Sequence, residues 1–211
     1  MRIRLKILLY AFVFVGYSVA NAGSYEDFFA AVQRNDAAAV SALLQRGFDP
    51  NTPDTKGQVG LFLALQAGNL AVAEPLLAHP GIQVEASNAA GETALMIAAL
   101  KGHLAWCQRL LDRGALPQRP GWSPLHYAAT GAEVKTVQLL LDRGADINAV
   151  SPNRSTPLMM AARYGSEASA LLLLERGADV KRANEQGLSA VDFARAGGRA
   201  ALAERWAAAA R

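Results

Sequence analysis

The chain has 211 residues, a formal net charge of +3 and a single cysteine, Cys107. This length allows one sizeable core or one extended repeat array. One cysteine excludes an internal disulfide and a cysteine-rich metal site, and the near balance of charges gives no sign of the clustered basic face that nucleic-acid binding requires.

Residues 1–22 are predicted to be a secretory signal peptide that is removed. Three basic residues within the first six positions precede an almost wholly apolar stretch over 7–19, and Ala20-Asn21-Ala22 supplies a small-x-small cleavage site before Gly23. An uncleaved membrane anchor is the alternative, but the apolar run is shorter than the roughly 18 to 20 residues of a spanning helix. We therefore expect a periplasmic protein, with export to the cell exterior as an open alternative.

One six-residue phrase recurs through the rest of the chain. Its copies begin at Thr93, Ser123, Thr156 and Ser189, at steps of 30, 33 and 33 residues. A period of this length predicts a stacked repeat array, because a single unit cannot bury its apolar face alone. Such arrays are typically binding surfaces.

Each unit is predicted to hold two short helices. Thr156 is a suitable N-cap for the first helix, and Pro157 suits its first position, where the missing N–H costs nothing. Gly68, Gly102 and Gly165 are expected to end first helices in the left-handed conformation. The second helices carry leucine pairs and mostly end at Arg-Gly, with a cation near the negative end of the helix dipole.

The copy Ser123-Pro124-Leu125-His126-Tyr127-Ala128 and the segment Gly102-His103-Leu104 resemble the 33-residue unit of the ankyrin repeat family. The resemblance covers about residues 24–206 and implies an all-α solenoid of about six helix–turn–helix repeats with short β-hairpin finger loops, as found in exported bacterial ankyrin proteins. The predicted ankyrin domain spans 23–211, with an N-terminal cap repeat at 24–51, repeats at 52–85, 86–118, 119–148 and 149–181, and a C-terminal cap repeat at 182–211.

Two places depart from the repeat pattern. The second unit opens at Val59 without a hydroxyl cap, and Pro75 falls within its second helix, where it would cost about 3 kcal/mol, so we expect this unit to be irregular. The stretch from Gly114 to Ser123 is three residues shorter than its equivalents, which predicts a shortened finger loop.

The sequence offers no sign of catalysis. His126 occupies a position at which the family's imidazole ties neighbouring turns together, a structural role is expected for His103, and His79 is expected to be a solvated turn residue. Cys107 is expected to be a small buried hydrophobe. We expect no enzyme activity, cofactor or metal; the remote alternative is an enzyme whose site is assembled from distant residues. Trp106 is expected in the core, and Trp206 is expected to close the last repeat against solvent.

The resemblance assigns partner contacts to the finger loops and the exposed side of the first helices. The candidate partner-binding residues are Lys56, Gln58, Glu92, Leu100, Lys101, Trp122, Thr130, Arg163 and Tyr164, followed by Gln186 and Leu188. Trp122 is either a binding anchor or a lid over the gap left by the shortened finger. Arg163 and Tyr164 are either a second anchor or an ordinary solvated helix end.

The functional hypothesis is a non-catalytic, monomeric protein-binding module in the bacterial periplasm that presents a rigid concave face to a protein partner as an accessory or scaffold factor. The alternative is an inhibitor or immunity-type protein that masks a toxic envelope enzyme. No nucleic-acid partner and no stable membrane insertion after cleavage of the leader are expected.

Overall fold

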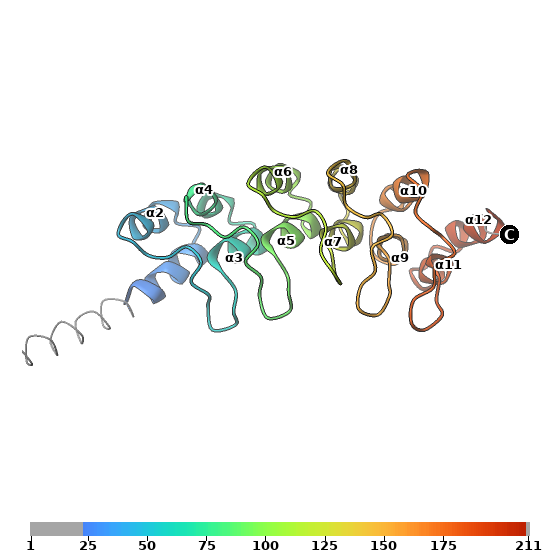
Figure 1. Ribbon diagram of the computed structural model, residues 1–211, viewed down its shortest axis with the longest axis horizontal. Coiled ribbons are helices and arrows are strands. Elements are labelled where there is room, and N and C mark those ends of the chain that lie inside the picture. The colour runs from blue at the N-terminus through green and yellow to red at the C-terminus, as the bar shows by residue number, and fades with distance from the viewer. Residues whose placement is uncertain (1–22, 210–211) are drawn as a thin grey trace, which may run out of the picture. The chain divides into compact units, whose positions relative to one another are not determined.

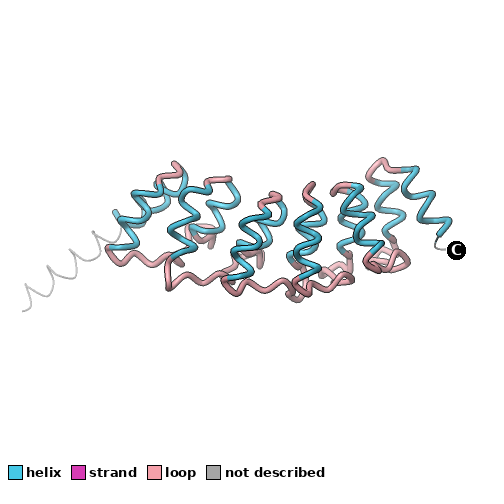
Figure 2. Tube along the Cα trace, turned by 90° about the horizontal axis from the view of Figure 1, so that it is seen from above, coloured by secondary structure: helices cyan, strands magenta, loops and turns pink. Residues whose placement is uncertain are grey.

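The computed structural model describes residues 23–209, so the predicted signal peptide lies outside the described residues (Figure 1). The chain divides into two compact units, described over residues 23–83 and 84–209. Both consist of helices joined by loops, and the described residues form isolated β-bridges but no extended strand, which confirms the all-α solenoid class (Figure 2). None of the helices within 23–209 has the length and apolarity needed to cross a membrane.

The first unit contains a helix over residues 23–33, α2 (Ala37–Gln45), α3 (Gly60–Ala67) and α4 (Leu70–Ala78). Phe28 is completely buried and stacks on Phe48, with 4.4 Å between the ring centroids. A Cβ atom on Gly60 would lie 2.8 Å from the Phe28 ring. Glycine therefore replaces the usual first residue of the helix because an aromatic side chain packs against its backbone.

The second unit contains α5 (Ala94–Leu100), α6 (Leu104–Asp112), α7 (Pro124–Thr130), α8 (Val134–Asp142), α9 (Pro157–Arg163), α10 (Glu167–Glu175), α11 (Ala190–Ala196) and α12 (Ala200–Ala209). The first helices of successive repeats, α5, α7, α9 and α11, pack side by side in one row. The second helices α6, α8 and α10 form another row, which lies above the first in Figure 1.

Hydroxyl side chains cap the first helices, as predicted. The Oγ1 atoms of Thr93 and Thr156 accept hydrogen bonds from the backbone N–H groups of Met96 and Met159, each at 3.4 Å. At α11 the Asp192 carboxylate accepts bonds from both the backbone N–H and the hydroxyl of Ser189. Each cap satisfies donors that the start of a helix leaves without a partner.

The core of the second unit runs between the two rows of helices. Leu95, Leu125 and Leu158 of the first helices are at most 1% exposed. One leucine of each predicted pair is also buried completely, and these leucines are Leu110, Leu140 and Leu173. Trp106 is 5% exposed and lies in the core as predicted, and Trp206, in the last helix, is buried to the same extent.

The second repeat is irregular as expected, although Pro75 does not interrupt its second helix. The helix α4 continues through Pro75, and the difference from other units lies at its end, where His79 is extended and no Arg-Gly turn follows. The expectation for Gly165 fails, whereas Gly68 and Gly102 are left-handed at φ 76° and 71°. Gly165 lies outside the left-handed region, and a Cβ atom there would overlap the carbonyl oxygen of Ala129. The absence of a side chain at this glycine allows two repeats to approach closely.

Loops of the predicted finger type connect successive repeats. Three of them close with a single antiparallel bridge, between Pro53 and Val59, Ser87 and Thr93, and Ala183 and Ser189. The loop over 149–155 closes with a hydrogen bond from Ser151 N–H to the Ser155 carbonyl. Its left-handed position is held by Arg154 at φ 61°, where the other fingers have Gly57, Gly91, Gly121 and Gly187.

Candidate protein-binding surface

Helix α7 is the centre of the candidate surface, and His126 ties it to its neighbours. The imidazole Nδ1 accepts a hydrogen bond from the backbone N–H of Ser123 at 3.2 Å and lies 2.9 Å from the Ser123 hydroxyl oxygen. Its Nε2 lies 3.0 Å from the carbonyl oxygen of Ser155. Because Nδ1 accepts, Nε2 carries the proton and donates to Ser155. The predicted structural role of His126 is therefore confirmed.

Burial determines the protonation of this imidazole. His126 is 1% exposed, and this burial lowers its pKa below 6.5. The hydrogen bond to the Ser155 carbonyl and the charge of Asp146 act in the opposite direction but are smaller. The neutral ring can thus keep one accepting and one donating nitrogen in a buried environment.

The shortened finger, residues 117–122, is held by Glu85. One carboxylate oxygen accepts a hydrogen bond from the Leu116 N–H at 3.0 Å, and the other lies 3.3 Å from the Arg119 guanidinium. The Gln118 side chain continues this support by accepting a bond from the Asp146 N–H at 3.0 Å. Asn51 and Asn148 make the equivalent bonds elsewhere, to the N–H groups of residues 83 and 179. On either side of the shortened finger, Glu85 and Gln118 make these bonds with longer side chains than asparagine.

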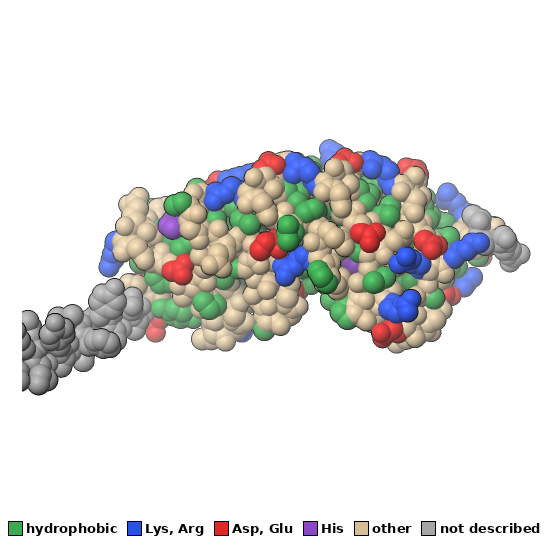
Figure 3. Space-filling model, in the orientation of Figure 1, with side chains coloured by type: hydrophobic (Ala, Val, Ile, Leu, Met, Phe, Trp, Pro, Cys, Tyr) green, Lys and Arg blue, Asp and Glu red, His purple; other side chains and the backbone are tan. Residues whose placement is uncertain are grey.

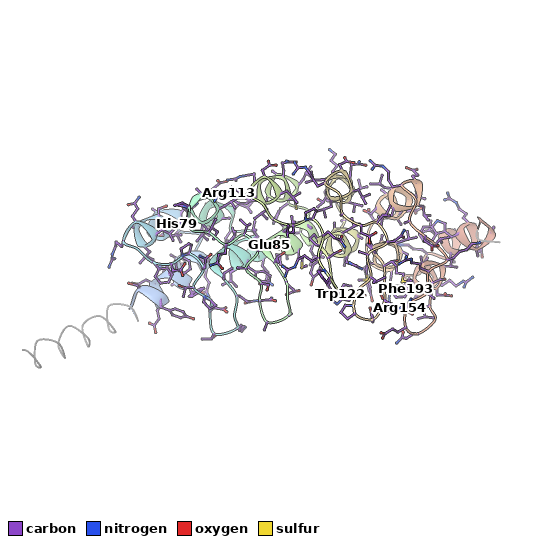
Figure 4. All side chains as sticks on the ribbon, in the orientation of Figure 1. His79, Glu85, Arg113, Trp122, Arg154 and Phe193 are labelled. Carbon is purple, nitrogen blue, oxygen red and sulfur yellow. The ribbon has the colours of Figure 1, made fainter. Side chains whose placement is uncertain are left out.

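Trp122 leaves this finger and packs against α7. Its indole lies edge-on to the His126 ring, with 5.3 Å between centroids and 76° between planes. Trp122 lies at the short loop before α7 (Figure 4) and remains half-buried. The side chain therefore covers part of α7 and still offers apolar surface to solvent, which combines features of the lid and the anchor.

A pocket of about 220 Å³ opens beside Trp122 on the exposed side of the first helices. Its lining comes from α5, α7, α9 and the end of the shortened finger, and consists of Leu100, Trp122, His126, Tyr127, Thr130 and Met160. Figure 3 shows hydrophobic side chains beside a notch below α7, where the finger is short. Thr130 is smaller than Leu100 and Arg163, which occupy the same position of the neighbouring first helices, and this difference leaves room for the pocket.

The hydroxyl and imidazole groups of the pocket are occupied by the protein itself. The Tyr127 hydroxyl donates to the Glu92 carboxylate at 2.8 Å, and the Thr130 hydroxyl donates to the His126 carbonyl at 2.8 Å. Burial and the bond to Glu92 raise the pKa of Tyr127, so its hydroxyl stays protonated. Together with the bonds of His126, these contacts leave an apolar lining without a free reacting group.

The other predicted contact residues fall into three groups. Lys56 and Gln58 lie in a finger of the first unit and do not line this pocket. Glu92 supports Tyr127 and also accepts from the Asn88 amide at 2.7 Å. Leu100 and Thr130 line the pocket, whereas Lys101, Arg163 and Tyr164 lie at or just after the ends of α5 and α9.

Arg163 and Tyr164 are both exposed. The guanidinium of Arg163 lies 5.1 Å from the centroid of the Tyr164 ring, in a cation–π contact. Gln186 and Leu188 lie exposed in the last finger, and Leu188 is 39% exposed. The surface thus offers aromatic and cationic side chains at a helix end as well as at the pocket.

Sequence reasoning missed Tyr127 and Met160 as surface residues and treated His126 only as a structural residue. Tyr127 and Met160 stand four positions after Ser123 and Thr156, and Thr130 and Arg163 stand three positions further on. Positions three apart share one face of a helix. Tyr127 and Met160 therefore lie on the same helix face as Thr130 and Arg163, and they could have been predicted from that spacing.

The remaining candidate chemistry is structural. Cys107 is completely buried, and burial raises the pKa of its thiol to about 12, as expected for a small hydrophobe and not for a nucleophile. Within residues 23–209, no three His, Cys, Asp or Glu side chains gather as metal ligands would. The fold and this surface define a helical-repeat protein with an apolar pocket on its first helices.

Comparison with known proteins gives the family. The model for ankyrin repeats (3 copies) matches residues 28–120 and 116–184, which is well over half of the chain. The chain belongs to the ankyrin repeat family.

Curated relatives share only the repeat region. The chain is 28% identical over 146 residues to transient receptor potential cation channel subfamily A member 1 of Homo sapiens, covering 64% of this chain and 13% of that protein. It is 27% identical over 134 residues to Rabankyrin-5 of Mus musculus, covering 61% of this chain and 12% of that protein. The chain therefore spans about an eighth of the length of these relatives.

A solved structure matches over nearly its full length. It is the complex of the predatory endopeptidase Bd0816 from Bdellovibrio bacteriovorus with the immunity protein Bd3460. The TM-score is 0.73 at 28% sequence identity, and the match covers 86% of this chain and 97% of that chain.

Proposed function

We propose that this chain is a non-catalytic protein-binding module of the immunity type, which binds and inhibits a peptidase exported by the same cell. The observation that carries the proposal is the likeness to a chain of the endopeptidase–immunity protein complex, which covers 86% of one chain and 97% of the other. A likeness of this extent goes beyond the short repeat regions shared with the larger relatives. It favours inhibition over the accessory or scaffold role.

The local chemistry supports a binding role and not a catalytic one. The histidine beside the pocket uses both ring nitrogens in structural hydrogen bonds, and the single cysteine is buried as a thiol. A preformed repeat surface loses little conformational freedom on binding, so a contact of modest area can be specific. A half-buried tryptophan and an exposed Arg–Tyr pair are the residue types that most often anchor such contacts.

The proposed location is the bacterial periplasm. The support is the basic, apolar and small-residue pattern of residues 1–22. An inhibitor in the compartment through which a peptidase is exported would protect the cell wall or envelope proteins of its producer.

The test uses the exported peptidases encoded by the producing organism, each purified and mixed with this protein. We expect one of them to form a stoichiometric complex in size-exclusion chromatography and to lose activity in proportion to the protein added. A peptidase that binds with unchanged or increased activity would support the accessory role instead. The absence of a complex with every exported peptidase would refute the proposal.

A further inference from the structure

We propose that the first unit, residues 23–83, unfolds and refolds in solution while the second unit, residues 84–209, stays folded. These units are the two compact parts into which the described chain divides. Each repeat of a stacked array contacts only its neighbours, so a weaker group of repeats at one end can open without the rest. The inference is independent of the proposed inhibition of a peptidase.

The start of α3 lacks the side-chain cap found at first helices of the second unit. Val59 stands at the N-cap position and makes no side-chain hydrogen bond to the helix. At the equivalent positions, Thr93 and Thr156 each accept a hydrogen bond from the backbone N–H three residues later. Loss of such a cap shifts a folding equilibrium about fivefold towards the open form. The first unit therefore begins one helix without this support.

Pro75 weakens the second helix of the same repeat. It lies inside α4, where its ring removes the backbone N–H that would bond to the carbonyl of Ala71. The equivalent positions of α6, α8 and α10 hold Arg109, Leu139 and Leu172, which have this N–H. Proline is about a hundredfold less favourable than alanine inside a helix. Both helices of this repeat thus have a local defect that the packing of the first unit must offset.

The second unit has ion pairs between repeats at the ends of its second helices. The Asp112 carboxylate lies 3.2 Å from the Arg143 guanidinium. The Asp142 carboxylate lies 3.1 Å from the Arg176 guanidinium in the same way. The equivalent residue at the end of α4 is Ala78, which has no charge. These exposed pairs are individually weak, but they recur in successive repeats and favour the closed form of the second unit.

The far end of the second unit is secured by Arg199. Its guanidinium donates to the carbonyl oxygen of Ala161 at 2.7 Å and to that of Gly165. These carbonyls lie at or just after the end of α9, so the last repeat is tied to the one before it. The Asp192 carboxylate also accepts two hydrogen bonds from Ser189 at the start of α11. The end of the array that carries the helix defects is therefore the first unit.

The packing of the first unit makes its closed form the major one. Phe28 and Phe62 are at most 1% exposed, and Phe28 stacks on Phe48. The Asn69 amide donates to the carbonyl oxygen of Val32 at 2.9 Å. An aromatic core and a bond between repeats hold this unit together, so opening is an excursion from a folded ground state.

Opening divides the candidate contact residues between two surfaces of unequal stability. Lys56 and Gln58 lie in the first unit, whereas Trp122 and the pocket beside it lie in the second. A protein partner that contacts both surfaces binds only the closed form. Such a partner would therefore hold the first unit closed and slow its opening.

Hydrogen exchange of the full-length protein, followed by mass spectrometry, tests the inference. Amides of a helix exchange when the unit that contains them opens. After correction for intrinsic chemical rates, the backbone amides of α3 and α4 should exchange roughly tenfold faster, or more, than those of α7 and α8. This difference would give the two units separate opening equilibria.

Two optical signals give an independent measurement. All three tryptophans, Trp106, Trp122 and Trp206, lie in the second unit, so their fluorescence reports on that unit. Far-ultraviolet circular dichroism reports on the helices of both units. During urea unfolding, part of the dichroism should be lost before the fluorescence changes, because transitions of different probes coincide only when unfolding has two states.

Three substitutions assign the effect to its source. Val59→Thr supplies the cap that Thr93 provides in the second unit, and should slow exchange in α3 and α4 about fivefold. Pro75→Ala restores a backbone donor and should slow the same amides roughly tenfold or more. Both variants should leave α7 and α8 unchanged. Thr156→Val is the matched control, which should speed exchange in α9 and leave α3 and α4 unchanged.

Three outcomes would overturn the inference. Equal exchange rates in α3, α4, α7 and α8 with coincident optical transitions would show a single cooperative fold. Stabilising substitutions that slow exchange equally in both units would show the same. A second unit that opens before the first would reverse the assignment. None of these measurements uses a peptidase, so failure of the proposed inhibition would leave them unaffected.

Discussion

The indole of Trp122 lies edge-on against the imidazole of His126, with 5.3 Å between the ring centroids. His126 in turn joins α7 to the next finger through its 3.0 Å contact with the Ser155 carbonyl. The position of the candidate anchor is therefore set by a buried ring that also connects two repeats. A change at Trp122 can act on binding, whereas a change at His126 acts on the fold.

Trp122→Ala should weaken binding of the protein partner by about 2 kcal/mol, because the substitution removes an apolar anchor. The half-buried side chain contributes less to the core, so the thermal midpoint should change little. Calorimetric titration and thermal unfolding measure the two quantities. Trp206→Ala is the matched control: this tryptophan is 5% exposed, and its loss should cost about 3–5 kcal/mol of stability. Loss of stability without loss of affinity in Trp122→Ala would identify a lid.

Gly165→Ala should destabilise the second unit by about 3 kcal/mol or more, because its Cβ would overlap the carbonyl oxygen of Ala129. Gly187→Ala is the control, since its Cβ would meet open space and only the left-handed backbone, at φ 74°, is strained. That cost is about 1–2 kcal/mol. Urea unfolding of both variants gives the comparison, and equal costs would contradict the close approach of the two repeats.

Arg154→Gly should raise the free energy of unfolding by up to about 1 kcal/mol, because glycine adopts φ 61° without a side-chain penalty. No hydrogen bond of the guanidinium within the described residues would be lost. Chemical denaturation tests the gain. A matched Arg195→Gly variant, within helix α11, should instead lower stability. A loss in both variants would show that Arg154 stabilises its finger.

Stability should fall as the pH is lowered below 6.5, in the range where the unfolded chain binds a proton at His126 and the folded chain does not. The pKa of His126 is lowered in the fold, so its contribution is complete above 6.5 and is lost as the pH falls towards the folded pKa. Protonation of Nδ1 would also break the bond from the Ser123 N–H. Urea unfolding between pH 5 and 8 measures the slope, and His126→Gln should reduce it. An unchanged slope in this variant would assign the effect to other groups.

Export should produce a chain that begins at Gly23 and is recovered with periplasmic markers. N-terminal sequencing and cell fractionation test this expectation, which follows from the cleavage site at residues 20–22. Replacing Ala20 and Ala22 together by bulky residues should leave the uncleaved precursor in the membrane fraction. A wild-type protein that stays in the cytosol, or that begins at another residue, would contradict the assignment.

The helical repeat could be read from the chain because it depends on local chemistry repeated at a fixed step. A hydroxyl at Thr93 or Thr156 caps a helix wherever it precedes one, and leucines such as Leu110 and Leu140 must be buried by a neighbour. The short finger before Trp122 was visible as missing residues. These features require only the order and spacing of side chains.

The pocket could not be read in this way, because it depends on distances between repeats. Tyr127 and Met160 line it together with Leu100, although each comes from a different first helix. The polar partners of Tyr127 and His126, which are Glu92 and the Ser155 carbonyl, also belong to neighbouring repeats. Gly165 depends on a neighbouring repeat in the same way, because a side chain there would overlap the Ala129 carbonyl of another helix. Periodicity establishes that repeats stack, whereas the gap beside Thr130 arises only when three stacked helices place side chains of unequal size next to one another.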